Sequence, residues 1–170
     1  MPDARFSVLI LAAGNSERMG RNKATLPFGN DLTFAGHLIS SYAQSGYSSI
    51  IMVVNERFSS AFIDSDKVKL VINHHLEKGR SWSVQLGLQN VPCGHSCFIQ
   101  NIDNPYADAD LLLQMCSAIS PDRYIVPVFN GKGGHPILLG NRLIDQLRMK
   151  SSIPNLRDAL GEFERFEVVS

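Results

Sequence analysis

The chain has 170 residues, which is enough for one compact domain with a full hydrophobic core. Apolar residues make up 44% and charged residues 19% of the sequence, as is typical of a globular protein. The formal net charge is zero, so we expect no nucleic-acid partner, and any phosphate site must be local. No apolar run approaches the length that a membrane span needs, so no membrane partner is expected. Three cysteines, an odd number, argue against a disulfide framework and favour a cytoplasmic location.

The N-terminal region begins with an apolar stretch that ends in a glycine. Residues 7–13 read as a buried strand of a parallel sheet, and Gly14 starts a turn. Successive backbone N–H groups in such a turn form a concavity that binds anions. Among the cations that follow, Arg18 suits phosphate oxygens as a bidentate fork and Lys23 as a point charge. We therefore predict a phosphate-binding loop here. The alternative is an ordinary strand-to-loop junction with solvated cations.

This loop differs from the common glycine-rich phosphate motifs. It is not a Walker A loop, because no Gly-Lys-Ser or Gly-Lys-Thr follows its second glycine. It also lacks the Gly-x-Gly-x-x-Gly pattern, which gives little support to a dinucleotide-binding fold.

The rest of the chain alternates between apolar strand-like runs and helix-like segments. After a turn at residues 26–30, we expect strands at residues 49–55, 68–73, 97–103, 124–129, 136–139 and 166–169. Helices are expected at residues 31–45, 58–63, 79–88, 110–119, 143–149 and 156–160. This alternation favours a parallel α/β sheet. No repeat or linker divides the sequence, so residues 1–170 are expected to form a single domain.

The predicted strand at residues 97–103 ends in a carboxylate. Asp103 would lie at the carboxyl edge of the sheet, where α/β proteins bind ligands. Because Mg²⁺ prefers one or two carboxylates together with phosphate oxygens and water, Asp103 is predicted to bind this ion beside the phosphate loop. The alternative is an Asp that forms a turn before Asn-Pro.

Two other groups of potential metal ligands are not interpreted as sites. Cys93, His95 and Cys97 resemble half of a zinc site. They lack a second pair of ligands at a suitable spacing, because Cys116 is isolated within a helical pattern. The pair His74-His75 follows a strand and reads as a polar loop.

The loop after the first strand resembles the signature of the MobA-like nucleotidyltransferases, Leu-Ala-Ala-Gly-x-Ser-x-Arg-Met-Gly-x-x-Lys. The matching residues are Leu11, Ala12, Ala13, Gly14, Ser16, Arg18, Met19, Gly20 and Lys23. The resemblance covers the chain from residue 6 to the end. It implies a single three-layer Rossmann-like domain of the glycosyltransferase-A type with a mostly parallel sheet. In that fold the residues from Leu11 to Gly14 would line the nucleotide, and Asp103 corresponds to the Asp of the family's Gly-Asp-x-Pro segment.

A second segment is similar to the family's Asn…Gly-x-x-x-Ser-x-x-x-Gly pattern. Asn73, Gly79 and Ser83 match it, and the resemblance implies that the Asn and Ser contact the nucleotide base and ribose. An Asn amide both donates and accepts hydrogen bonds, which allows it to bind a base edge. The alternatives are an Asn that ends a strand and a Ser that caps a helix.

A third segment, Gly134-His135-Pro136, matches the family's Gly-His-Pro. The resemblance places His135 on the acceptor side, and it favours cytidylyltransferases of the molybdenum cofactor over guanylyltransferases. A lone His is otherwise often a structural residue, and both readings stay open. His135 is not expected to be a general base, because a phosphate nucleophile is already ionised near neutral pH.

The reaction that the resemblance implies is nucleotidyl transfer. A phosphate of the acceptor attacks the α-phosphate of CTP or GTP, and pyrophosphate leaves, which requires positioning and charge neutralisation. Mg²⁺ would bridge Asp103 and phosphate oxygens, while Arg18 and Lys23 would stabilise charge on the triphosphate. The expected acceptor is a phosphorylated small molecule, first of all a molybdopterin-type cofactor.

The end of the sequence departs from the family pattern. Members often continue past a segment like Leu156-Arg157-Asp158 into an Asp-x-Asp-Thr-like motif that supplies a second metal-binding Asp, whereas this sequence stops at Ser170. Asp145 and Asp158 are the remaining late carboxylates, and both fall in helix-like patterns. The alternative function is therefore a nucleotide-binding module of the same fold with little or no catalysis.

Overall fold

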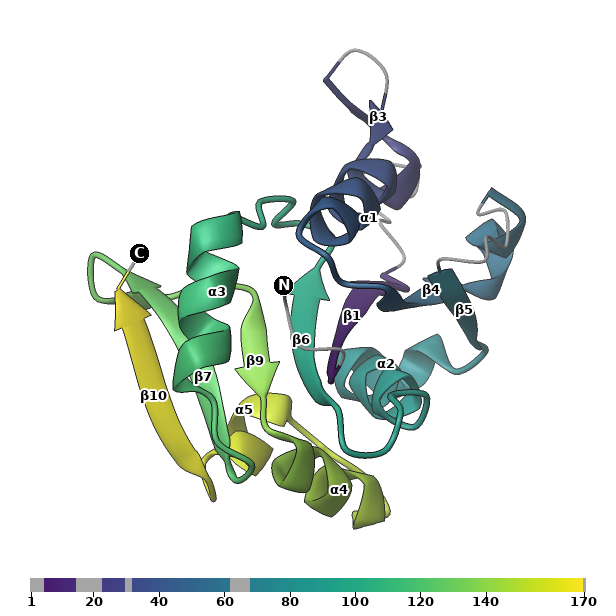
Figure 1. Ribbon diagram of the computed structural model, residues 1–170. Coiled ribbons are helices and arrows are strands. Elements are labelled where there is room, and N and C mark those ends of the chain that lie inside the picture. Colours follow the sequence, from purple (N-terminus) through teal and green to yellow (C-terminus); the bar gives the residue numbers. More distant parts are fainter. Residues whose placement is uncertain (1–4, 15–22, 30–31, 62–67, 170) are drawn as a thin grey trace.

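A central sheet with helices on both faces forms the body of the protein (Figure 1). The computed structural model describes residues 5–14, 23–29, 32–61 and 68–169. The strands are β1 (Phe6–Ala12), β2 (Pro27–Phe28), β3 (Leu32–Thr33), β4 (Ser49–Asn55), β5 (Val68–Asn73), β6 (Ser96–Asn101), β7 (Arg123–Phe129), β8 (Lys132–Gly133), β9 (Ile137–Leu139) and β10 (Glu164–Val169). The helices are α1 (Phe34–Gln44), α2 (Gly79–Leu88), α3 (Ala109–Ala118), α4 (Asn141–Met149) and α5 (Leu156–Leu160), with short 3₁₀ helices η2 (Lys23–Thr25), η3 (Glu56–Ala61) and η4 (Leu76–Lys78).

The strand order in the sheet is β10-β7-β9-β6-β1-β4-β5, with β8 paired to β7. β1 is parallel to β4 and β6, and β4 is parallel to β5. The carboxyl ends of these four strands therefore open at the same edge of the sheet. β9 is antiparallel to both β6 and β7. The predicted mostly parallel α/β fold is confirmed.

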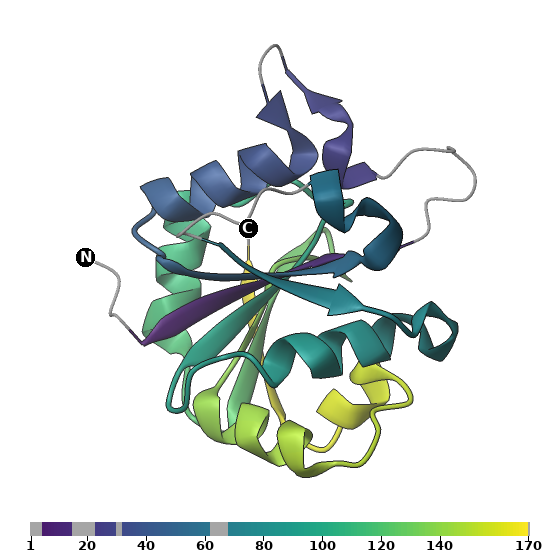
Figure 2. The same cartoon turned by 90° about the vertical axis from the view of Figure 1, so that its right-hand side faces the viewer.

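Successive residues of β1 point to opposite faces of the sheet, and this alternation builds two hydrophobic cores. Val8 and the alternate residues after it pack against α1 and α3, through buried side chains such as Leu38 and Met115. Leu9 and the alternate residues after it pack against α2, α4 and α5, through side chains such as Val84. Figure 2 shows these helices as one layer on each side of the sheet. Both faces of β1 are buried, which explains why residues 8–12 are continuously apolar.

The boundaries of several elements differ from the predictions for local reasons. The first helix begins at Phe34 instead of residue 31, because the Thr33 side chain caps it by accepting a hydrogen bond from the Gly36 N–H at 3.1 Å. Residues 27–28 pair with residues 32–33 as a small hairpin, where a turn was expected. β6 ends at Asn101, so Asp103 lies in the turn that follows, which the Asn104 N–H closes by bonding to the Asn101 carbonyl at 3.1 Å.

The antiparallel direction of β9 follows from the tight turn after β7. Asn130 and Gly131 have φ angles of 49° and 74°, in the left-handed region that reverses a chain over a few residues. The apolar periodicity alone carries no direction, so this reversal was not predicted. Among the helices that the structure describes, none combines the length and apolar character that a bilayer crossing requires.

Candidate active site

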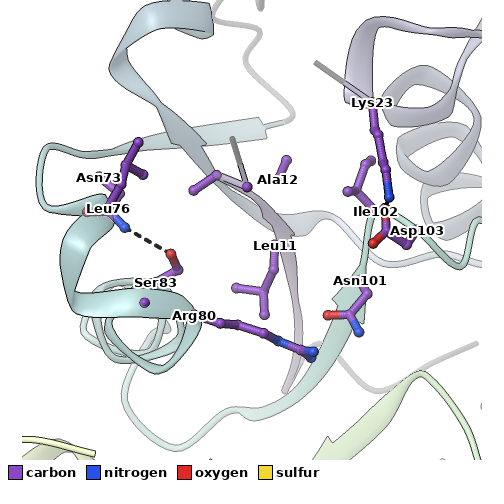
Figure 3. Close-up of a pocket in the computed structure, with 13 residues that line it drawn as sticks. Leu11, Ala12, Lys23, Asn73, Leu76, Arg80, Ser83, Asn101, Ile102 and Asp103 are labelled. Atoms are coloured by element: carbon purple, nitrogen blue, oxygen red, sulfur yellow. Dashed lines mark hydrogen bonds and ion pairs between the residues drawn. The ribbon is translucent and has the colours of Figure 1, made fainter. Parts of the chain in front are cut away.

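A cavity of about 410 Å³ opens at the carboxyl ends of β1, β5 and β6, beside the start of α2 (Figure 3). It is lined by Leu11, Ala12, Ala13, Gly14, Lys23, Asn73, Leu76, Gly79, Arg80, Ser83, Asn101, Ile102 and Asp103. Nine of the residues predicted to bind nucleotide or metal are in this set. His135 lies instead in a neighbouring cavity, and Arg18 falls outside the described residues.

We call this first cavity the nucleotide cavity, after the ligand predicted from the sequence. Lys23 and Asp103 form an ion pair at its rim. The Lys23 Nζ lies 2.8 Å from the Asp103 Oδ1, and the two side chains are 39% and 60% exposed. Figure 3 shows the two side chains meeting, Lys23 from η2 and Asp103 from the turn after β6. The cavity therefore carries a cation and a carboxylate that are both accessible to a ligand.

Asn73 and Ser83 are joined on the opposite side of the cavity. The Asn73 Nδ2 donates to the Ser83 Oγ at 2.9 Å, and the Asn73 Oδ1 accepts from the His75 N–H at 2.8 Å. Both side chains are nearly buried, with 1% and 5% exposure. The Asn73 amide thus holds the end of β5 against α2, and one N–H and one oxygen lone pair remain for a ligand.

The first turn of α2 faces the same cavity with open backbone N–H groups. Gly79 has a φ of 74°, and Lys78 at the N-cap provides no side-chain hydrogen bond to the turn. Uncapped N–H groups and the positive end of the helix dipole favour an anionic or polar ligand. The helix can lie this close to β1 because Gly87 packs on Leu9, where an added Cβ would come within 2.2 Å of the Leu9 Cδ1.

A second cavity of about 630 Å³ adjoins the first. Its cationic and polar lining includes Arg80, His135, Arg157 and Arg165, and its apolar lining includes Tyr124, Val84, Leu156 and Leu160. No Asp or Glu is among the described residues that line it. We call it the acceptor cavity, and its character suits an anion with an apolar or aromatic body.

His135 lines the acceptor cavity and is hydrogen-bonded to Asn101, which lines the nucleotide cavity. Its Nδ1 donates to the Ile99 carbonyl at 3.3 Å, and its Nε2 accepts from the Asn101 Nδ2 at 2.8 Å, which assigns the neutral tautomer with the proton on Nδ1. Burial lowers the pKa of His135 most, the Ile99 carbonyl raises it, and the positive charge of Arg80 lowers it further. The lowered pKa and these two hydrogen bonds keep the imidazole neutral near pH 7.

Asp103 fits a hard divalent cation that is held mainly by substrate. Within the described ranges, no three His, Cys, Asp or Glu side chains gather as a metal site. Mg²⁺ accepts one carboxylate when phosphate oxygens and water complete its shell, and the Asn101 amide oxygen lines the same cavity. Asp145 is paired with Arg148 at 3.1 Å on α4, and neither it nor Asp158 is among the residues lining the nucleotide cavity.

The sequence interpretation missed the cationic character of the acceptor cavity. Arg80, Arg157 and Arg165 come from α2, α5 and β10, and only the fold brings them together. Arg80 lies between Gly79 and Ser83, two residues predicted to bind the ligand. Its position in the sequence could therefore have indicated that it also lines the site. The Cys93–Cys97 segment is instead held to β1, because the His95 Nδ1 is hydrogen-bonded to the Ser7 Oγ at 2.9 Å. Cys93, Cys97 and Cys116 are all free thiols.

Comparison with known proteins identifies the family of this chain. Residues 8–165 match the family described as the MobA-like NTP transferase domain. The chain is 28% identical, over 166 residues, to the molybdenum cofactor cytidylyltransferase of Escherichia coli (strain K12), covering 94% of this chain and 83% of the relative.

Solved structures show the same fold. Rv0371c from Mycobacterium tuberculosis H37Rv matches with a TM-score of 0.82 and 20% identity, over 100% of this chain and 91% of that chain. A complex of Rv0371C with manganese from the same organism matches with a TM-score of 0.78 and 18% identity, over 98% of this chain and 88% of that chain. The comparisons confirm the predicted family, fold class and enzyme class, a nucleotidyltransferase.

Proposed function

We propose, because the chain belongs to the MobA-like NTP transferase family, that it moves a CMP or GMP unit from CTP or GTP to a phosphorylated small molecule. One observation carries the proposal. Ala13 and Gly14 after β1, the first turn of α2, Lys23 and Asp103 converge on one cavity, and a cationic cavity with no carboxylate among its described lining residues adjoins it. A triphosphate and an anionic acceptor thus have separate, adjoining places.

In this proposal the described residues divide between three tasks. Gly14 and Lys23 bind the triphosphate, with Arg18 assigned to the same task from the sequence alone. Asn73 and Ser83 contact the base and ribose with the hydrogen-bonding capacity that their mutual bond leaves open. His135 contacts the acceptor in its own cavity.

The transfer needs no protein nucleophile. An oxygen of the acceptor phosphate forms a bond to the α-phosphorus, the bond from that phosphorus to the bridging oxygen breaks, and pyrophosphate leaves with the electron pair. The chain's part is to align the two phosphates and to offset their charge. A divalent ion, proposed here as Mg²⁺, would be held by Asp103 and phosphate oxygens and would neutralise charge on the triphosphate.

The acceptor is proposed to be a molybdopterin-type cofactor. The acceptor cavity combines arginines with Tyr124 and aliphatic side chains, which suits a phosphate attached to a flat ring system. The E. coli relative is named a molybdenum cofactor cytidylyltransferase, which supports testing this acceptor and CTP first.

The experiment is a pyrophosphate-release assay on the whole chain. CTP and GTP are each supplied with Mg²⁺ or Mn²⁺ and with a panel of phosphorylated acceptors that includes molybdopterin. Acceptor-dependent release supports the proposal. Nucleotide binding without release by any acceptor would favour the binding module instead. The pairing of Asp103 with Lys23 also supports that reading, because Asp103 is the one carboxylate among the described residues that line the cavity.

A further inference from the structure

Arg80 occupies the boundary between the two cavities. Within the part of the chain that the structure describes, it is the residue that lines both of them. Figure 3 shows its side chain running from the start of α2 across the nucleotide cavity toward Asn101 on β6. Asn101 in turn bonds to His135 of the acceptor cavity. The guanidinium therefore lies where a ligand in either cavity would meet a ligand in the other.

The charge of Arg80 has no partner among the described residues. No described carboxylate lies within 4.0 Å of its guanidinium, although other arginines of this fold, such as Arg142 and Arg148, are paired. Partial desolvation lowers the pKa of Arg80 most, and the more distant charge of Asp103 raises it. Because a guanidinium stays protonated in proteins, a fixed positive charge without a local counter-charge faces both cavities.

The proposed reaction creates a need for such a charge at this boundary. The acceptor phosphate and the α-phosphate are both anions, and they must approach to bonding distance, where their repulsion is strongest. A guanidinium offers five N–H donors along two edges, so one side chain can bind two phosphates at once. Lys23 cannot bind both phosphates, because it lines the nucleotide cavity but not the acceptor cavity.

We propose that Arg80 binds the α-phosphate of the nucleotide and the phosphate of the acceptor together, and so brings the two reacting groups into contact. This inference rests on the proposed transfer for its catalytic meaning. The binding that it asserts can be measured without turnover. Arg157 and Arg165 line the acceptor cavity but not the nucleotide cavity, and they are left to the remainder of the acceptor.

The test compares Arg80→Ala, Arg80→Lys and the control Arg142→Ala by calorimetry. Arg142 is a surface arginine of α4, paired with Asp122 and absent from the lining of both cavities. The probes are CTP without metal and phenyl phosphate, a monoester that matches the mixed lining of the acceptor cavity. Phenyl phosphate is titrated into protein already saturated with CTP, so that it reports on the acceptor cavity.

We expect Arg80→Ala to weaken both probes by about tenfold or more, the loss expected for charge-assisted hydrogen bonds. Arg80→Lys keeps the charge but loses the forked guanidinium. It should therefore recover part of the affinity for CTP, but little of the affinity of the CTP-saturated protein for phenyl phosphate. Arg142→Ala should bind both probes as the parent does. The free energy of unfolding without ligands should not fall in Arg80→Ala, because this side chain has no ion-pair partner within 4.0 Å among the described residues.

With an active acceptor, Arg80→Ala should lower kcat by about 10²-fold, and added guanidinium ion should restore part of it. A residue that only supports the fold would show no such rescue. Retained affinity for either probe in Arg80→Ala, or no binding of phenyl phosphate to the parent, would overturn the inference while leaving the transfer intact. A parent that binds both probes through Arg80 but releases no pyrophosphate would instead reject the transfer alone.

Discussion

Replacing Asp103 by Asn should separate catalysis from stability. The Asp103 carboxylate is paired with the Lys23 Nζ at 2.8 Å, but the Asp103 side chain is 60% exposed and the Lys23 side chain 39% exposed. Exposed ion pairs contribute only about 0–1 kcal/mol to folding, because water and salt screen them. We therefore expect Asp103→Asn to change the free energy of unfolding by less than about 1 kcal/mol.

The effect on turnover should be far larger than the effect on stability. Asn keeps the size and much of the hydrogen bonding of Asp but removes the charge that would hold a divalent ion beside the phosphates. An electrostatic contact of this kind is worth several kcal/mol in the transition state, so kcat should fall by about 10²-fold or more. Binding of CTP without metal should stay equal or become tighter, because a negative charge near the phosphates is removed.

The measurement combines pyrophosphate release with urea unfolding, and Asp122→Asn is the matched control. Asp122 is paired with Arg142, and these side chains are 52% and 64% exposed, so the control breaks a comparable pair away from both cavities. It should show the same small stability change and unchanged turnover. Full turnover in Asp103→Asn would refute the metal role and turn attention to Asp158. A stability loss of several kcal/mol would show that we underestimate the ion pair.

Three further substitutions test other parts of the site. Asn73→Ala removes the buried bond to Ser83 and should cost about 1–3 kcal/mol of stability in urea unfolding, while altering the preference for CTP over GTP more than the overall affinity for triphosphates. An equal loss of both nucleotides would place Asn73 outside the base pocket. Gly87→Ala forces a Cβ against Leu9 and should destabilise by about 1–3 kcal/mol, and a loss below about 0.5 kcal/mol would mean that α2 can shift freely. His135 has a pKa below its ordinary 6.5, so the folded state binds fewer protons than the unfolded chain, and stability should fall as the pH drops below about 6.5. His135→Asn should flatten that part of the pH profile, and an unchanged profile would contradict the assignment.

The fold could be predicted largely because both faces of the central strands are buried. Residues 8–12 of β1 and 50–54 of β4 are continuously apolar for this reason, and the predicted limits of both strands differ from the observed ones by a residue or less. Strand direction and the hairpin at residues 27–33 depend on turn geometry and backbone pairing, which apolar periodicity does not record. The helix start at Phe34 was missed because a Thr cap competes with a longer apolar pattern.

The clustering of Gly14, Asn73 and Asp103 in the first cavity could be predicted from sequence because they sit at or just after strand ends. Gly14, Asn73 and Asp103 each follow an apolar run, and parallel strands carry such residues to one edge. The acceptor cavity could not be predicted in this way. Arg157 and Arg165 lie in α5 and β10, far in sequence from α2, and their convergence depends on how β7, β9 and β10 pack.

The Lys23–Asp103 pair is consistent with a site that rearranges when nucleotide arrives. An exposed pair contributes at most about 1 kcal/mol, so breaking it costs little. A triphosphate offers Lys23 several oxygens of higher charge than one carboxylate, and it arrives with a divalent ion that needs a carboxylate ligand. In the proposed function both side chains would gain from the exchange, Lys23 by turning to phosphate and Asp103 by turning to the metal. The pair would therefore hold the two side chains at the rim without opposing the proposed bound state, and we expect Lys23→Met to weaken CTP binding in a calorimetric titration.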